Sequence, residues 1–451
     1  MLLGLLNKFV WGAPALILIL GVGFIVSIRT GFVQIRLFRV ACRTFLRSLR
    51  GDGGNDGVSS FRALCTALAA TVGTGNLVGV AGAICLGGPG AVFWMWVCGL
   101  IGMATKFAEV TLALRYRVKH NGEYTGGPMY IITQGLGKKW APLAAAYGFF
   151  GMIAALGVGN ATQINAVIGG MNSVITSWGG SESRVGNLIM GAFLAAAVGM
   201  MLLGGARRIG AVAEFLVPFA SVAYILLCGS VLALRIEAVP GAFLTILQGA
   251  FNPNAVTGGV LGSSFRALRV GVSRGVFTNE AGMGTASMAH ASAQVDHPVC
   301  QGLMGIMEVF LDTIVICTMT ALVILVSCVS VPYGIDAGST LTNQAFSAVL
   351  GEWVSVVLAL AMCCFAFATV LGWGLYGARC CQYLFGPDSW KKFVLFQIAA
   401  VIFSATLETD VIWSFSETVN GLMAVPNLIA LVILSPELRD MTYEYKLKYG
   451  E

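Results

Sequence analysis

The sequence predicts an all-α protein that crosses a membrane many times. Of the 451 residues, 57% are hydrophobic and only 11% are charged, whereas a soluble domain carries roughly 25% charged residues. Apolar runs of about 20 residues, the length of a membrane-spanning helix, recur along the whole chain. These runs lack the period-two alternation of a membrane β-barrel. The predicted fold class is therefore a polytopic helical membrane protein.

Eleven apolar segments are predicted to be transmembrane helices. The first segment is not followed by a cleavage site of small residues, so we interpret it as a retained helix and not as a signal peptide. Charged residues, or glycine and proline, separate each segment from the next. The predicted spans are residues 10–28, 60–87, 91–114, 143–178, 186–204, 210–234, 258–290, 299–329, 351–378, 392–407 and 411–435.

Basic residues concentrate on one side of the membrane if the eleven helices alternate in direction. Six arginines lie in residues 29–50, directly after the first helix, and the tail carries Arg439, Lys446 and Lys448. By the positive-inside rule, this pattern predicts an N-terminus outside and a cytoplasmic C-terminus. The basic residues that fit this topology poorly, because they lie on its outer side, are Arg266, Arg269 and Arg274.

The segment 36–50 is predicted to be an amphipathic helix on the cytoplasmic membrane surface. Phe38, Cys42, Phe45 and Leu49 fall on one helical face, and arginines fill the rest. Such a helix lies on the anionic inner leaflet, so membrane lipid is a predicted partner. The net charge of +6 therefore requires no nucleic acid.

The stretch 71-TVGTGNLVG-79 places Gly73, Gly75, Gly79 and the polar Asn76 in the middle of a predicted span. Glycine costs about 1 kcal/mol relative to alanine in a helix interior. One interpretation is a broken helix, which a membrane tolerates only where the freed backbone is buried in protein or lines a cavity. The alternative is close GxxxG-type packing of an intact helix through Gly75 and Gly79.

A second stretch, 275–291, repeats this pattern five spans later. Asn279 and Glu280 are followed there by Gly282 and Gly284, again within an apolar span. Without the N-terminal helix, the two stretches lie in the first and sixth of ten spans, and an odd number of spans per half inverts the second half. Two glycine-interrupted helices at matching places in inverted halves indicate the binding site of a secondary transporter.

The inverted repeat predicts that the chain is divided into four parts. Residues 1–59 hold the N-terminal helix and the amphipathic segment, 60–237 and 238–436 are two five-helix repeats, and 437–451 form a cytoplasmic tail. A cation channel is a rival function, but channels usually repeat one filter sequence in identical subunits. An intramembrane enzyme is another, but the chain has no HExxH motif. Twelve cysteines, mostly inside apolar runs, have no metal-site spacing.

The sequence resembles the alanine or glycine:cation symporter family, also called sodium:alanine symporters, of the amino acid–polyamine–organocation superfamily. This resemblance implies a leucine-transporter-type 5+5 inverted repeat preceded by one extra helix. It implies uptake of alanine, glycine or a similarly small neutral amino acid coupled to Na⁺, or alternatively to H⁺, and neither enzymatic activity nor an organic cofactor. The matching stretches are GTGNLVGV (73–80), GGPGAVFWMW (87–96), KFAEVTLALRYR (106–117), YTGGPMY (124–130), FTNEAGMGTASMAHA (277–291) and ATVLGWGLYG (368–377).

The resemblance also implies particular site residues. Amides of Thr74 and Gly75 would hold the substrate carboxylate, FTNEAGMG at 277–284 would be the second unwound segment, and Trp373 would limit side-chain size. Freed amides at a helix start suit an anion, and freed carbonyls suit Na⁺. The implied sodium ligands are Ala69, Val72, Phe365 and Thr369. The implied substrate-binding residues are Thr71, Gly73, Thr74, Gly75, Asn76, Gln163, Phe277, Thr278, Asn279, Gly282, Thr369 and Trp373.

Ionisable residues inside apolar runs are functional candidates, each with a structural alternative. Lys106 and Glu109, three residues apart, predict a mutually neutralising pair or an ion relay. Glu308 and Asp312 could serve a cation or proton, or only bond neighbouring helices. Glu280 could assist the ammonium group or cap free amides. The sequence leaves these roles open, together with the oligomeric state, D- against L-selectivity and the number of ions.

Overall fold

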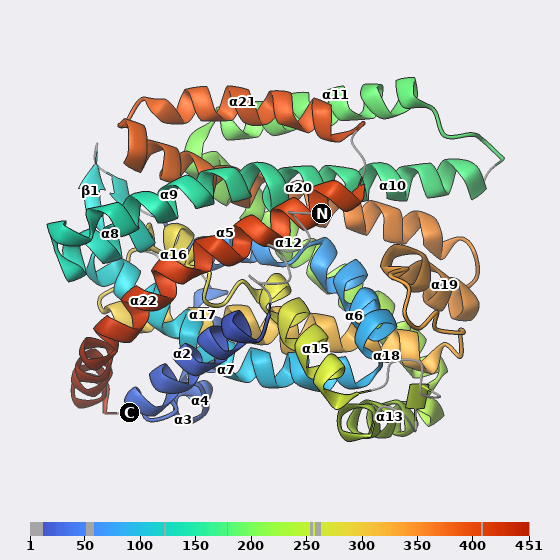
Figure 1. The fold of residues 1–451 in the computed structure, drawn as a ribbon, viewed down its shortest axis with the longest axis horizontal. Coiled ribbons are helices and arrows are strands. Elements are labelled where there is room, and N and C mark those ends of the chain that lie inside the picture. The colour runs from blue at the N-terminus through green and yellow to red at the C-terminus, as the bar shows by residue number, and fades with distance from the viewer. Residues whose placement is uncertain are drawn as a thin grey trace.

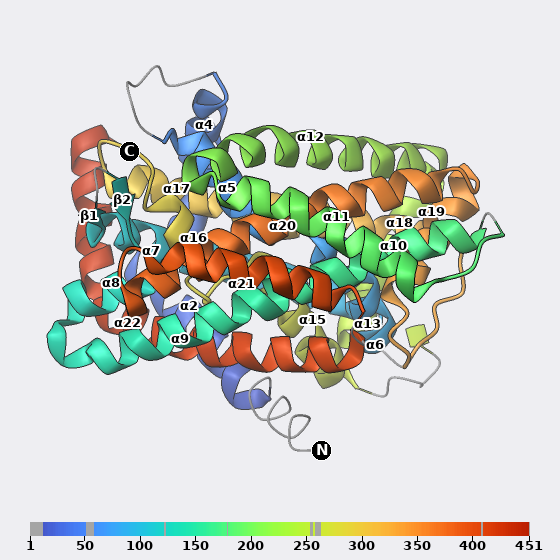
Figure 2. The same ribbon diagram turned by 90° about the horizontal axis from the view of Figure 1, so that it is seen from above.

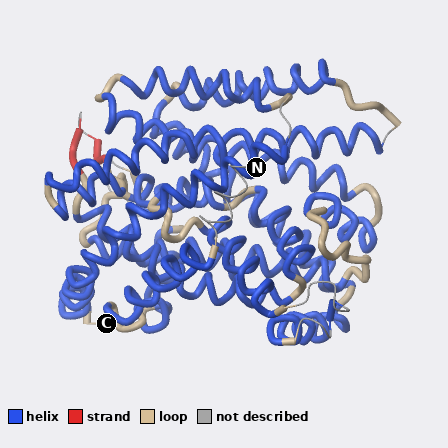
Figure 3. The backbone as a smooth tube through the Cα atoms, viewed as in Figure 1, coloured by secondary structure: helices blue, strands red, loops and turns tan. Residues whose placement is uncertain are grey.

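Helices make up nearly all of the described chain (Figures 1 and 3). In the described part, strands β1 (Val118–His120) and β2 (Glu123–Thr125) form an antiparallel pair in which Val118 lies opposite Thr125. The computed structural model describes residues 12–50, 58–120, 123–177, 179–252, 256–257, 263–406 and 409–450.

The first half of the chain carries most of the predicted helices near their expected positions. Its helical elements are α2 (Ala13–Arg29), α3 (Val33–Arg36), α4 (Phe38–Ser48), α5 (Ser60–Thr71), η1 (Gly75–Gly79), α6 (Val80–Gly87), α7 (Gly90–Arg115), α8 (Pro128–Tyr130), η2 (Ile131–Leu136), η3 (Lys138–Trp140), α9 (Ala141–Leu156), η4 (Gly157–Ala161), α10 (Thr162–Ser177), α11 (Arg184–Leu202) and α12 (Gly205–Leu234).

The second half adds two helices that the sequence analysis did not predict, α13 and α19, of 13 residues each. In the chain α13 follows α12 and α19 follows α18, and neither has an apolar run of spanning length. The elements are η5 (Ile236–Ala238), α13 (Val239–Phe251), α15 (Ser264–Asn279), α16 (Thr285–His290), α17 (Pro298–Val309), η6 (Phe310–Cys317), α18 (Thr318–Val326), α19 (Gly338–Leu350), α20 (Val354–Phe385), α21 (Ser389–Ser404) and α22 (Thr409–Tyr449).

The predicted count of eleven spans is not confirmed. In the described part, 7 helices are long and apolar enough to cross a membrane, or up to 8 if the bent pair formed by α5 and η1–α6 counts as one span. Each predicted segment does contain helix, but α2 has 17 residues and α21 has 16. The segment 258–290 is divided between α15 and α16. An apolar run in the sequence indicates the length of a segment, but it does not indicate the residue at which the helix within that segment ends.

The broken helices occupy the interior of the molecule. The α5–α6 pair packs between α20 on one side and α15, α17 and α19 on the other, and α7 supports α15 and α17 (Figure 1). Figure 2 shows α12 along one side of the molecule and α9 and α22 along the other, with α20 between them. Helices α11 and α21 lie side by side at the periphery, where Phe193 and Phe403 are 74% and 69% exposed. Exposed apolar side chains suit helices that face lipid.

The predicted amphipathic helix is present as α4, and its apolar face packs on protein. The Phe38 ring lies 5.0 Å from the Phe310 ring, and Phe45 packs against a cluster that includes Leu303 of α17. Leu46 and Leu49, farther along the segment, remain exposed. Contact with lipid therefore stays a prediction for this end.

Two of the arginines that fitted the predicted topology poorly have local partners. Arg266 donates from Nε to the Leu86 carbonyl at 2.7 Å, at the end of α6. Arg274 Nη2 lies 3.2 Å from Asp336 Oδ2. Their charges are therefore placed against a helix C-terminus, whose carbonyls favour cations, and against a carboxylate.

Candidate functional site

The first predicted break is present. Helix α5 ends at Thr71, and the chain turns by 53° before it continues as Gly75–Gly87. Val72 is extended, with φ −78° and ψ 97°, and the Gly73 amide donates to Asn76 Oδ1 at 2.9 Å. A Cβ added at Gly79 would have nothing within 4 Å. The alternative of tight GxxxG packing therefore fails at Gly79.

The second break is also present, but it is shorter than predicted. Helix α15 continues through Asn279, so Phe277 and Thr278 lie in its last turn and not in unwound chain. The unwound part is 280–284, where Glu280, Gly282 and Gly284 have φ values of 54°, 96° and 77°. Glycine adopts this left-handed conformation without the strain that a side chain adds, which explains two of the three positions.

Glu109 holds the second break, a role that the sequence analysis missed. Its Oε1 accepts hydrogen bonds from the amides of Gly282 (2.9 Å) and Gly284 (3.0 Å) and from Asn427 Nδ2 (2.8 Å). Gly282, a predicted substrate residue, therefore contacts Glu109 and Asn427 in this structure. Lys106 forms its ion pair with Glu308, at 3.1 Å, and not with Glu109 as predicted.

The first break meets α10 and α20. Thr74 Oγ1 donates to Gln163 Oε1 at 3.1 Å, and a Cβ added at Gly73 would lie 2.7 Å from Thr369 Oγ1. Thr369 also donates to the Phe365 carbonyl at 3.0 Å. The structure thus brings five of the predicted site residues together at one place, next to the carbonyls that end α5.

The first break faces the last turn of α15 at Gly75. A Cβ added there would lie 3.0 Å from Thr278 Cγ2 and 3.5 Å from the Phe277 ring. Both residues are buried. A side chain at position 75 would press against Thr278, so glycine permits this approach and leaves the amide end of η1 next to the last turn of α15.

Two further predicted residues contact η6. Asn76 Nδ2 donates to Asp312 Oδ1 at 2.6 Å, and Asn279 Nδ2 donates to Thr313 Oγ1 at 3.1 Å. All four side chains are buried. Thr313 was not predicted, and no spacing in the sequence marks it.

Trp373 connects α20 to the second break. Its indole N–H donates to Glu280 Oε1 at 2.9 Å, and Thr285 Oγ1 donates to Glu280 Oε2 at 2.6 Å. The ring packs directly on Gly159 of η4, where an added Cβ would overlap it. Gly159 was missed, although 157-GVGNA-161 is a third glycine-rich interruption of an apolar span that could have indicated it.

A buried polar network ties the cytoplasmic ends predicted for both broken helices to α7 and α17. Glu308 contacts Lys106 through Oε1 at 3.1 Å and His290 Nε2 through Oε2 at 3.1 Å. Gln301 Nε2 lies 2.7 Å from His290 Nδ1, and Ser60 Oγ donates to Gln301 Oε1 at 2.6 Å. The chain of contacts therefore runs from the start of α5 to the end of α16.

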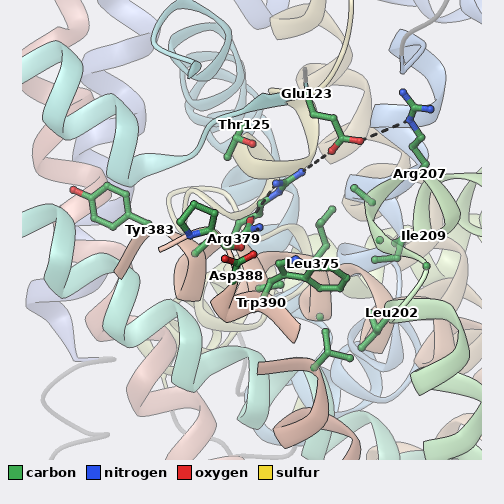
Figure 4. Close-up of a pocket in the computed structure, with 18 of the residues that line it drawn as sticks. Glu123, Thr125, Leu202, Arg207, Ile209, Leu375, Arg379, Tyr383, Asp388 and Trp390 are labelled. Carbon is green, nitrogen blue, oxygen red and sulfur yellow. Dashed lines mark hydrogen bonds and ion pairs between the residues drawn. The ribbon is translucent and has the colours of Figure 1, made fainter. Parts of the chain in front are cut away.

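A cavity of about 630 Å³ lies between the β1–β2 hairpin, the start of α12, the C-terminal part of α20 and the start of α21. Figure 4 shows Glu123 between Arg207 and Arg379, with N–O distances of 3.7 and 3.8 Å. None of the predicted site residues lines it, although Gly374 follows Trp373 directly. The cavity is therefore separate from the place where the first break meets α15.

Comparison with known proteins gives consistent matches over the whole chain. Residues 1–450 match the family model described as the sodium:alanine symporter family. The sodium/alanine symporter AgcS of Methanococcus maripaludis is 41% identical, over 96% of this chain and 94% of that protein. The probable sodium/glutamine symporter GlnT of Bacillus subtilis is 35% identical, over 99% and 91%. A crystal structure of MhsT in complex with L-phenylalanine matches the fold with a TM-score of 0.58 at 14% identity, covering 87% of this chain and 99% of that one.

Proposed function

The chain belongs to the sodium:alanine symporter family and is a transporter, not an enzyme, and we propose that it couples inward Na⁺ movement to uptake of alanine or glycine. The observation that carries this proposal is the meeting of two broken helices. Gly73 and Gly75 of the first break lie against Thr369, Gln163, and Thr278 with its neighbour Phe277. Both breaks free backbone groups that an intact helix would use internally.

The proposed substrate site lies between these breaks. The amides of Thr74 and Gly75 begin the second piece of the first helix, where the helix dipole favours a carboxylate. Gln163, already bonded to Thr74, is within reach of the same group. Phe277 and Thr278 are the proposed opposite wall, where they would restrict the site to a small amino acid.

The proposed Na⁺ site lies at the C-terminal end of α5. Carbonyls in the last turn of a helix have no intrahelical partner, so those of Ala69 and Val72 are available to a cation. The Phe365 carbonyl and the Thr369 hydroxyl, 3.0 Å apart, supply oxygen ligands from α20. A sodium ion bound there would hold α5 and α20 together.

The proposed mechanism is alternating access between two inverted repeats, 60–237 and 238–436, with the N-terminus outside and the C-terminus in the cytoplasm. Na⁺ and substrate bind together from outside, the two broken helices rock against the rest, and both leave inside. The fold match to MhsT supports the shared fold on which this mechanism depends. Linkage requires that Na⁺ raise the affinity for the amino acid and that the amino acid raise the affinity for Na⁺ by the same factor.

Uptake into proteoliposomes tests the proposal. Labelled alanine, glycine and glutamine are compared while Na⁺, Li⁺ and pH gradients are varied separately. We expect saturable alanine or glycine uptake that requires an inward Na⁺ gradient, with glutamine excluded by Phe277 and Thr278. Uptake driven by a pH gradient alone would replace Na⁺ by H⁺ as the coupling ion, and current without saturable uptake would indicate a channel.

A further inference from the structure

Asp312 accepts hydrogen bonds that originate at the first break. The Gly73 amide donates to Asn76 Oδ1 at 2.9 Å, and Asn76 Nδ2 donates to Asp312 Oδ1 at 2.6 Å. A backbone N–H can only donate, so the Asn76 oxygen must face Gly73 and its NH₂ group must face Asp312. The side chain of Asn76 therefore connects the freed Gly73 amide to the buried Asp312 carboxylate through two hydrogen bonds.

The same carboxylate accepts a matching chain from the second break. The Ala281 amide donates to Asn279 Oδ1 at 3.0 Å, which again fixes the orientation of the side-chain amide. Asn279 Nδ2 donates to Thr313 Oγ1 at 3.1 Å, and the Thr313 hydroxyl donates to Asp312 Oδ2 at 2.8 Å. Each oxygen of Asp312 is thus reached from a different broken helix.

The local backbone supports a specialised role for this residue. Asp312 lies in η6, a π-helical stretch within a transmembrane span, and such wide turns frequently occur at functional sites. Its side chain and that of Thr313 are fully buried. A carboxylate that only bonded two packed helices would not need an asparagine at each break to connect it with a freed backbone amide.

We propose that Asp312 and Thr313 are positioning residues that couple the two breaks, so that the geometry of either break depends on the other. This inference rests on the proposed function, since a substrate bound between the two broken helices needs both breaks at fixed positions relative to each other. Asp312 accepts through both oxygens, from Asn76 Nδ2 at Oδ1 and from the Thr313 hydroxyl at Oδ2. Removal of one link frees one break from the other while every predicted substrate residue remains.

Thr313→Val removes the link from the second break at nearly constant shape, and Thr313→Ser retains the hydroxyl. We expect Thr313→Val to raise the half-saturating concentrations of alanine and Na⁺ by about tenfold each, because it leaves buried polar groups unpaired. Thr313→Ser should stay within about twofold of the wild type. The readout is the initial rate of labelled alanine uptake into proteoliposomes, normalised to folded protein.

Thr320→Val is the matched control, since Thr320 is equally buried in the same span and bonds Tyr224 at 2.8 Å. It should lower the yield of folded protein without changing either half-saturating concentration. Equal values for Thr313→Val, Thr320→Val and the wild type would overturn the coupling. If Thr313→Val does not reach the membrane, Asp312→Asn is measured in its place and judged by the same two half-saturating concentrations. This variant keeps the shape of the side chain, but its NH₂ group must donate to Thr313, which reverses the direction of that hydrogen bond. Wild-type uptake that fails to follow Na⁺ would instead overturn the proposed function.

Discussion

Thr369 shows how a single hydroxyl becomes informative once its neighbours are known. On α20 it is 2% exposed and bonds the Phe365 carbonyl one turn earlier, which many threonines in membrane helices do. What distinguishes it is the absence of a side chain opposite: Gly73 leaves the Oγ1 atom adjacent to the end of α5. A hydroxyl oxygen next to carbonyls that end a helix is a suitable ligand for Na⁺.

Thr369→Ala should weaken Na⁺ binding and alanine uptake together. Loss of one of the proposed oxygen ligands is expected to raise the half-saturating Na⁺ concentration by about tenfold, which corresponds to about 1.4 kcal/mol. Thr369→Ser, which keeps the oxygen, is the control. Sodium titration of alanine uptake measures both variants, and an unchanged titration curve for Thr369→Ala would remove Thr369 from the ion site.

At the scale of an element, the glycines of the broken helix α5–α6 differ in how closely other side chains approach them. An alanine Cβ at Gly73 would meet Thr369 Oγ1 at 2.7 Å, and at Gly75 it would meet Thr278 Cγ2 at 3.0 Å. Gly79, one turn later in the same apolar run, has open space around its Cα and a helical φ of −66°. Composition alone does not distinguish these three glycines, whereas their packing in the structure does.

Gly73→Ala and Gly79→Ala form a matched pair on one helix. We expect Gly73→Ala to abolish most alanine uptake, since the methyl group fills the space between α5 and Thr369. Gly79→Ala should transport normally and be more stable by about 0.5–1 kcal/mol, because alanine loses less backbone entropy in a helix than glycine. Uptake and thermal unfolding in detergent measure the pair, and equal transport by both variants would contradict the packing argument.

At the scale of the whole molecule, a buried ionic network joins both broken helices to their support. Glu308 lies between Lys106 on α7 and His290 on α16, and these three side chains are fully buried. Through Gln301 the network reaches Ser60 at the start of α5. A buried charge that loses its partner costs far more than the intact pair contributes. Replacement of one residue of this network alone should therefore be strongly destabilising.

Lys106→Met should lower the free energy of unfolding by about 3–5 kcal/mol, because it leaves Glu308 without its cation. The double variant Lys106→Met with Glu308→Leu should recover much of this loss. The exposed pair Arg439–Asp440, 58% and 62% exposed, provides the comparison: Arg439→Gln should change stability by less than about 1 kcal/mol. Thermal unfolding in detergent separates the cases, and additive losses in the double variant would contradict the argument.

The sequence by itself determined the membrane class, the approximate positions of the helices and the two places where helices break. These features are local: an apolar run, or glycines and polar residues inside one, has consequences that neighbouring residues do not override. Thus 71–79 and 275–291 could be predicted as breaks from the sequence alone, because the same pattern recurs at matching places in the two halves.

Only the tertiary structure decided which side chains hold those breaks. Glu109 bonds an amide 173 residues away, and Asn76 bonds a carboxylate 236 residues away. Lys106 pairs with Glu308 on another helix and not with Glu109 one turn along. Such partners depend on how helices cross, and that crossing follows from the packing of many side chains at once. Helical spacing fixes which residues share a face, but it does not specify what that face will meet.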